Sequence, residues 1–152
     1  MTPGATVLDV AAGRGRHARF FAERGHKVTA VDRDTGALAA QANLEIVTAD
    51  LEDGSPWPLG GRKFGAIVVA NYLHRPLMPT LLDALEREGV LLYDTFMIGN
   101  ERFGRPSRPE FLLKDGELLE LVHGRFSVIA YEARLISEPR MAMVQRIAAR
   151  RL

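Results

Sequence analysis

The 152-residue chain contains no cysteine. Disulfides, thiolate metal sites and cysteine nucleophiles are therefore excluded. The chain also lacks any run approaching the roughly 20 consecutive apolar residues that a membrane-spanning helix needs. No basic segment followed by an apolar run stands at its N-terminus, so no secretory signal is visible. We therefore expect a cytoplasmic protein that makes no membrane contact.

An excess of charge of one sign is also absent, because 20 Lys and Arg residues balance 19 Asp and Glu residues. Nucleic-acid binding usually requires accumulated positive charge, so a nucleic-acid partner is not expected. His17, His26 and His123 are scattered without the spacing of metal ligands, and no metal site is predicted. Hydrophobic residues make up 47% and charged residues 26%, which is typical of a folded protein. The length predicts one domain over residues 1–152.

Short apolar runs alternate with helical patterns along most of the chain. The pattern predicts strands at 6–10, 27–31, 45–48, 64–70 and 90–95, and helices at 16–24, 34–42, 76–88 and 116–122. Such alternation favours a doubly wound α/β sheet with mostly parallel strands. Two extended runs, 125–137 and 140–149, are separated by only two residues. They predict an antiparallel hairpin at the C-terminal end.

The first strand leads directly into a turn that contains two glycines. Residues 7–18 read VLDVAAGRGRHA, with Asp9 in the strand and Gly13 and Gly15 before the helix. A glycine backbone turns tightly and exposes N–H groups to a ligand. Gly13, Gly15 and Ala18 satisfy the dinucleotide fingerprint, and Asp32 follows Gly13 by 19 residues, near the ~20 typical of a ribose-binding acid. An NAD-dependent oxidoreductase is therefore one interpretation.

Two features distinguish the possible ligands. Asp9 lies four residues before Gly13, where a negative charge would repel a pyrophosphate and attract a cationic or amine-bearing ligand. The chain also closes with a hairpin rather than with a further parallel unit.

Together these motifs resemble those of the class I S-adenosylmethionine-dependent methyltransferases, in the same order over nearly the whole chain. Residues 8–15 (LDVAAGRG) resemble the first motif of that family, and 31–33 (VDR) the acidic end of its second strand. The segments 48–51 (TADL), 64–71 (FGAIVVAN) and 88–92 (EGVLL) resemble its later motifs. The resemblance implies a Rossmann-like methyltransferase sheet and S-adenosylmethionine as the cofactor.

The resemblance also implies roles for particular residues. Asp32 would hold both ribose hydroxyls, and Asp50 would accept a hydrogen bond from the exocyclic amine of adenine. The backbone at Ala11 and Gly13 would take the methionine ammonium, with Asp9 ordering the loop. The cofactor-binding residues expected are Asp9, Ala11, Gly13, Gly15, Asp32, Arg33, Asp50, Leu51 and Asn71.

Two segments are candidates for the acceptor side of the reaction. The first, 71–76 (NYLHRP), contains Tyr72, His74 and Arg75 as candidate catalytic residues. His74 would act as a general base and Arg75 would hold an anionic acceptor, while Tyr72 packs on the cofactor. A structural hydrogen bond is the alternative role for His74. The second, 95–106, is either a substrate wall or a structured surface loop. Both segments distantly resemble the tellurite-resistance branch of the family.

Most members of this family carry helices before the first strand that cover the cofactor, whereas only residues 1–5 precede it here. We expect that such a lid is missing, that a partner subunit of a homodimer covers the site, or that the site is open. An open site excludes water poorly, which lowers activity. The expected function is methyl transfer to a small-molecule acceptor. The alternatives are an S-adenosylmethionine-binding module with little or no turnover and an NAD-dependent oxidoreductase.

Overall fold

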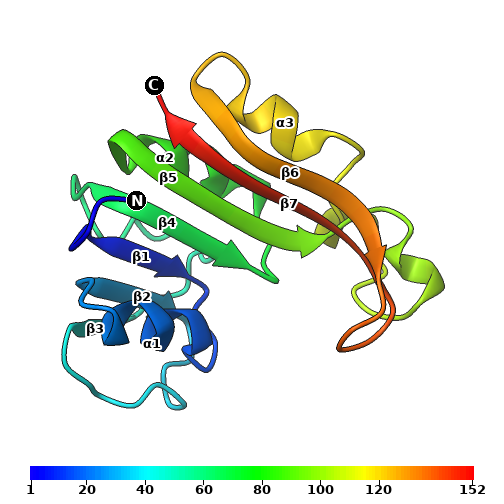
Figure 1. Cartoon of the computed structure of the whole chain (residues 1–152). Coiled ribbons are helices and arrows are strands. Elements are labelled where there is room, and N and C mark those ends of the chain that lie inside the picture. Colours follow the sequence, from blue (N-terminus) through cyan, green and yellow to red (C-terminus); the bar gives the residue numbers. More distant parts are fainter.

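Seven strands form one mixed sheet in the computed structural model, which describes all of residues 1–152 (Figure 1). The strand order is β3-β2-β1-β4-β5-β7-β6; β1 to β5 run parallel, and β7 is antiparallel to β5 and β6. The strands are β1 (Val7–Val10), β2 (Val28–Asp32), β3 (Leu44–Thr48), β4 (Phe64–Ala70), β5 (Leu85–Phe96), β6 (Phe126–Ile136) and β7 (Ala142–Arg151). The predicted doubly wound sheet with a closing antiparallel hairpin is confirmed.

Three α-helices and three short 3-10 helices connect the strands. They are α1 (Arg16–Glu23), η1 (Arg75–Leu77), α2 (Met78–Asp83), η2 (Asn100–Arg102), η3 (Pro109–Phe111) and α3 (Glu117–Val122). No helix has the length and apolar character needed to cross a bilayer.

The two faces of the sheet carry separate apolar cores. On one face, α2 and α3 pack against the strands in a cluster of 23 buried residues that includes Leu81 and Leu118. On the other face, α1 contributes Ala18 and Phe21 to a cluster of nine. The central strands are therefore buried from both sides, which explains why β4 is a continuous apolar run and why every residue of β1 is buried, Asp9 included.

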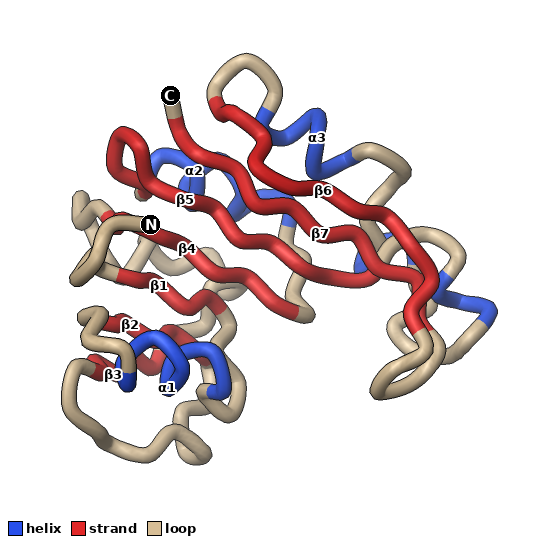
Figure 2. Tube along the Cα trace, in the orientation of Figure 1, coloured by secondary structure: helices blue, strands red, loops and turns tan.

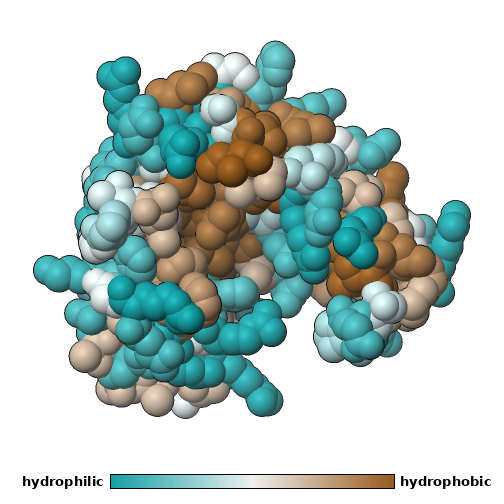
Figure 3. All heavy atoms as spheres, viewed as in Figure 1, coloured by the Kyte–Doolittle hydropathy of each residue, from teal (hydrophilic) through white to brown (hydrophobic).

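The two faces are covered unequally. Figure 2 shows α1 in front of the β1 to β3 side, whereas no helix lies over β4, β5, β7 and β6 on that face. Figure 3 shows apolar atoms gathered in a hollow over the middle of the same face. This hollow is a cavity of about 660 Å³.

The helix predicted at residues 34–42 is wrong, because this segment forms turns instead. Asp32 Oδ1 accepts a hydrogen bond from the Asp34 N–H, and Asp34 Oδ1 accepts one from the Gly36 N–H. These side-chain bonds offer the backbone an alternative to helical hydrogen bonds. Only Leu38 in this segment is buried, so there is no apolar face to hold a helix against the sheet.

The helix predicted at 76–88 ends early, because α2 stops at Asp83 and β5 starts at Leu85. Leu85 pairs with Phe64 in the sheet and is almost fully buried. Gly89 lies within the strand and does not terminate a helix. A Cβ at Gly89 would lie 2.8 Å from the Glu86 carbonyl oxygen, so glycine permits an irregular, close backbone here.

Candidate functional site

A cavity of about 390 Å³ opens at the carboxyl ends of the parallel strands. Ligands of doubly wound sheets bind at this edge, where the strand order reverses, and here the reversal lies between β1 and β4. The cavity brings together five of the predicted cofactor residues with Tyr72. Its lining residues are Ala11, Asp32, Arg33, Ala49, Asp50, Leu51, Glu52, Tyr72 and Phe111.

The glycine turn joins β1 to α1 beside this cavity. Gly13 and Gly15 both have left-handed backbones, with φ values of 58° and 83°. The Gly15 N–H donates to the Ala12 carbonyl oxygen over 2.9 Å, which closes the turn. A Cβ at Gly13 would meet nothing within 4 Å, whereas a Cβ at Gly15 would lie 2.5 Å from Leu38 Cδ2. Gly13 therefore leaves its surroundings open to a ligand, and Gly15 allows close packing.

We expect Gly15→Ala to destabilise the protein more than Gly13→Ala. Both substitutions force alanine into a left-handed backbone, which costs about 1–2 kcal/mol. Gly15→Ala must also displace the buried Leu38 side chain, which should add about 1 kcal/mol or more. Urea unfolding of the two variants measures the difference. Equal losses would show that Leu38 moves aside without cost.

Asp32 is fixed in place by the turn. Its Oδ2 accepts a hydrogen bond from the Gly13 N–H over 2.8 Å, and its Oδ1 accepts one from the Asp34 N–H over 3.0 Å. Each carboxylate oxygen has a second lone pair and can accept a further hydrogen bond. The carboxylate is therefore oriented by the protein and still able to bind a diol.

Asp9 lies in β1 and is almost fully buried, and it does not line the cavity. Its Oδ2 has no hydrogen-bond partner. Burial raises the pKa of Asp9 to about 7, and the charge of Asp32 adds to this, whereas a hydrogen bond from the Ala18 backbone opposes it. This carboxyl lacks a compensating positive charge, so a bound cation nearby would be stabilised.

Ala11 and Asn71 adopt left-handed backbones directly after β1 and β4, with φ values of 54° and 55°. The Asn71 N–H donates to the Asp94 carbonyl oxygen over 2.9 Å, which ties it to the end of β5. Asparagine tolerates this conformation, but alanine is strained in it. Strained residues collect at ligand sites, and this pair flanks the strand reversal.

Glu52 contacts two of the predicted catalytic residues, Tyr72 and His74. The sequence did not predict this role for Glu52. Tyr72 Oη donates to Glu52 Oε2 over 3.1 Å, and His74 Nδ1 lies 3.4 Å from Glu52 Oε1. Burial chiefly raises the pKa of Tyr72, and Glu52 raises it further, so this phenol stays protonated. Tyr72 lines the cavity, but His74 does not.

Two further lining residues were not among the predicted site residues. They are Ala49 and Phe111, and Phe111 comes from η3, which is distant in the sequence.

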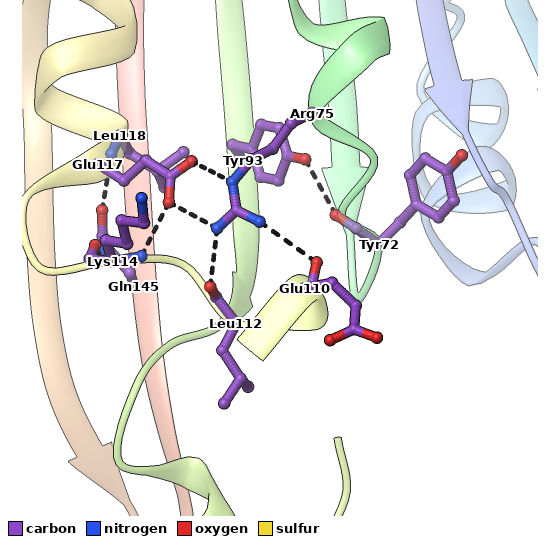
Figure 4. Close-up of polar contacts among 9 residues, drawn as sticks. All are labelled: Tyr72, Arg75, Tyr93, Glu110, Leu112, Lys114, Glu117, Leu118 and Gln145. Carbon is purple, nitrogen blue, oxygen red and sulfur yellow. Dashed lines mark hydrogen bonds and ion pairs between the residues drawn. The ribbon is translucent and has the colours of Figure 1, made fainter. Parts of the chain in front are cut away.

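Arg75 makes four hydrogen bonds within the protein (Figure 4). Its Nε and Nη2 donate to the two carboxylate oxygens of Glu117 over 2.7 and 2.9 Å. Its Nη2 and Nη1 also donate to the carbonyl oxygens of Leu112 and Glu110 over 2.8 and 3.3 Å. Arg75 therefore links η1, which follows β4, to η3 and α3. These contacts favour a structural role over the predicted binding of an anionic acceptor.

The loop at 95–106 packs against the β6–β7 hairpin. Asn100 is buried; its Nδ2 donates to the Pro106 carbonyl oxygen over 2.9 Å and its Oδ1 accepts from the Met143 N–H over 3.1 Å. No residue of this loop lines the 390 Å³ cavity. The contacts favour the structured loop of the two alternatives.

Comparisons with known proteins identify a family for the chain. A family model described as a methyltransferase domain matches residues 7–88. No curated protein sequence matches the chain significantly.

Similar solved structures share the fold. TehB from Haemophilus influenzae superposes with a TM-score of 0.78 at 17% identity, covering 97% of this chain and 58% of TehB. A methyltransferase from Mesorhizobium loti gives 0.75 at 17% identity, covering 99% and 94%. The 1,6-didemethyltoxoflavin-N1-methyltransferase of Burkholderia thailandensis, solved with its substrate and S-adenosylhomocysteine, gives 0.68 at 20% identity, covering 97% and 71%. The chain thus spans little more than half the length of TehB.

Proposed function

The chain belongs to the methyltransferase domain family, and from this premise we propose that it transfers a methyl group from S-adenosylmethionine to a small-molecule acceptor. The observation that carries the proposal is the Asp32 carboxylate, which the Gly13 N–H holds at a 390 Å³ cavity beyond the carboxyl ends of the strands. A carboxylate in this place suits a ribose diol, since charge-assisted hydrogen bonds are the stronger class.

The residues at the site fit the rest of this cofactor. Asp50 lines the same cavity and suits the exocyclic amine of adenine, and Leu51 supplies an apolar wall for the base. The open space at Gly13 allows backbone contact with the methionine end. The unpaired Oδ2 of Asp9 favours a positive charge nearby, as an ammonium provides.

Other predicted residues have supporting positions in this proposal. Arg33 lines the cavity beside Asp32, and Gly15 closes the turn. Asn71 lies at the end of β4, toward the acceptor side. His74, held near Glu52, remains a candidate base outside the cavity lining. When bound, the cofactor supplies an electrophilic methyl group, so the protein has mainly to align the acceptor and exclude water.

A dinucleotide is the competing cofactor, because the glycine turn and the Asp32 carboxylate also satisfy its fingerprint. Calorimetry with S-adenosylhomocysteine and with NADH distinguishes the two cofactors. We expect binding of the first and no response to the second. The reverse result would overturn the proposal in favour of an oxidoreductase. Transfer of a labelled methyl group to metabolite pools would then separate an enzyme from a binding module.

Asp32→Ala is expected to weaken binding of S-adenosylhomocysteine by about 1.5–3 kcal/mol, roughly tenfold to more than a hundredfold, because hydrogen bonds to a charged group are lost. Asp34→Ala is the matched control, since Asp34 is an exposed neighbour that accepts a turn hydrogen bond but does not line the cavity. Calorimetry on both variants makes the comparison. Unchanged affinity in Asp32→Ala would refute the ribose role.

A further inference from the structure

Phe111 in η3 presents an exposed aromatic ring at the cofactor cavity. The residue is 43% exposed and belongs to neither apolar core, yet it lines the 390 Å³ cavity. The Arg108 guanidinium lies 5.9 Å from the ring centroid, which is the outer limit of a cation–π contact. The fold therefore gains little from packing this ring, and the ring is available to contact a ligand.

Arg75 binds the backbone on both sides of Phe111 (Figure 4). Its guanidinium donates to the Glu110 carbonyl oxygen over 3.3 Å and to the Leu112 carbonyl oxygen over 2.8 Å. Both carboxylate oxygens of Glu117 accept hydrogen bonds from the same guanidinium. A bidentate ion pair fixes the orientation of the planar guanidinium and so the direction of its other N–H groups. The place of the Phe111 ring is thus set by contacts of the main chain on either side of it.

Further hydrogen bonds hold the chain around η3. The Phe111 N–H donates to the Arg108 carbonyl oxygen over 2.9 Å, which closes the 3-10 turn. Leu112 and Leu113 are buried, and the Leu113 N–H donates to the Phe96 carbonyl oxygen, at the end of β5, over 3.0 Å. A side chain on an anchored segment loses little conformational freedom when a ligand binds. Phe111 therefore combines an exposed ring with a fixed backbone.

The residues that line the cavity divide between the two sides of β1. Asp32 and Asp50, which suit the nucleoside, follow β2 and β3 on one side of β1. Tyr72 follows β4 on the other side, and Arg75, three residues later, joins Phe111 to this segment. A cofactor whose ribose binds to Asp32 reaches the β4 side only with the part that extends beyond the ribose. This part contains the sulfur.

We propose that Phe111 packs against the reacting end of the cofactor, at the sulfur that carries the methyl group, and that Arg75 positions Phe111 for this contact. The inference rests on the proposed function. An apolar ring in this place excludes water from the reacting centre. Phe111 contacts the cofactor directly, whereas Arg75 is a positioning residue that acts through Phe111.

Calorimetry with S-adenosylhomocysteine and with adenosine tests the contact. Adenosine contains the base and the ribose but lacks the sulfur and the amino acid. Phe111→Ala should weaken binding of S-adenosylhomocysteine about threefold to tenfold, because an aromatic contact is lost, and change that of adenosine less than about twofold. Phe103→Ala is the matched control, because Phe103 is 38% exposed but does not line the cavity. It should bind both ligands as the unsubstituted protein does.

An isotope-filtered NMR experiment locates the ring. In the complex with S-adenosylhomocysteine, we expect nuclear Overhauser effects between a phenylalanine ring and the methylene protons next to the sulfur. Phe111 is the one phenylalanine that lines the cavity, so these signals should disappear in Phe111→Ala and remain in Phe103→Ala. Signals from the Phe111 ring to the adenine protons alone would overturn its placement at the sulfur.

Arg75→Lys tests the positioning role. Lysine keeps a positive charge beside Glu117 but lacks the planar fork that also reaches the two carbonyl oxygens. This variant should weaken binding of S-adenosylhomocysteine about threefold and leave that of adenosine unchanged, and it should add no loss when combined with Phe111→Ala. Equal weakening of both ligands, or an additional loss in the double variant, would show that Arg75 does not act through Phe111.

The unsubstituted protein separates this inference from the proposed function. If it binds S-adenosylhomocysteine and Phe111→Ala binds the same ligand equally well, the inference is overturned and the proposed function stands. If the unsubstituted protein does not bind S-adenosylhomocysteine, the proposed function fails and the inference fails with it. Selective weakening of S-adenosylhomocysteine in Phe111→Ala, without weakening in Phe103→Ala, supports both.

Discussion

Replacing Arg75 with methionine is expected to lower the free energy of unfolding by about 2–3 kcal/mol. The substitution leaves the Glu117 carboxylate, whose side chain is only 16% exposed, without its partner. It also removes the donors to the Leu112 and Glu110 carbonyl oxygens. Arg75 depresses the pKa of Glu117, chiefly through its hydrogen bonds, which shows that the pair is coupled in the folded state. Urea unfolding at neutral pH measures the loss.

Arg125→Met is the matched control for this prediction. Arg125 forms an ion pair of similar length with Asp83, over 2.9 Å, but both side chains are largely exposed. Exposed pairs contribute about 0–1 kcal/mol, so this variant should be nearly neutral. Equal losses in the two variants would show that the Arg75 network adds nothing beyond a surface ion pair. A selective loss would confirm that Arg75 anchors α3 to η1.

The sheet was predictable because its signals are local. A strand buried on both faces is typically an apolar run, which β4 supplies without interruption and β1 supplies with Asp9 as its one polar residue. The antiparallel hairpin was predictable because its two extended runs are separated by only two residues of sequence. The two helix errors have different causes. Side-chain hydrogen bonds of Asp32 and Asp34 form turns at the start of residues 34–42, whereas residues 85–89 join the sheet through a pairing that a short window does not contain. Leu85 fits a helical face as well as a strand, and its pairing with Phe64 decides between them.

The cavity residues that were predictable are those that belong to the sequence motifs at the strand ends. Ala11, Asp32 and Asp50 lie at strand ends and meet at one cavity. By contrast, Arg75 meets Glu117 across 42 residues of sequence, and Phe111 reaches the cavity from a distant loop. The larger cavity was not predicted either. The apolar pattern of a strand shows that a face is apolar, but it does not show whether a helix covers that face.

Replacing Asp9 with asparagine is expected to remove most of the pH dependence of stability between pH 4 and pH 7. The unfolded carboxyl titrates near 3.8 and the folded one near 7, so the folded state holds more protons in this range. Unfolding free energy of the unsubstituted protein therefore falls as the pH rises from 3.8, by about 1.4 kcal/mol per pH unit, and levels off above 7. The total loss is roughly 4 kcal/mol.

Asp9→Asn cannot ionise, so this variant should be the more stable one at pH 8 and nearly equal to the unsubstituted protein at pH 4. Asp34→Asn is the control, as this carboxylate is exposed and should leave the slope unchanged. Urea unfolding as a function of pH measures all three proteins. If Asp9→Asn retains the slope, another group is responsible for it.

The same carboxyl connects stability to cofactor binding. A positively charged ammonium placed near Asp9 favours its ionised form, so binding below pH 7 should release a proton from a group that is otherwise protonated. Calorimetry of S-adenosylhomocysteine binding at pH 6.5, in buffers of different ionisation enthalpy, detects this release. Asp9→Asn should bind without it. Equal proton release by the unsubstituted protein and by Asp9→Asn would place the ammonium away from Asp9. If Asp9→Asn releases no proton, Asp9 is the group that loses its proton when the cofactor binds.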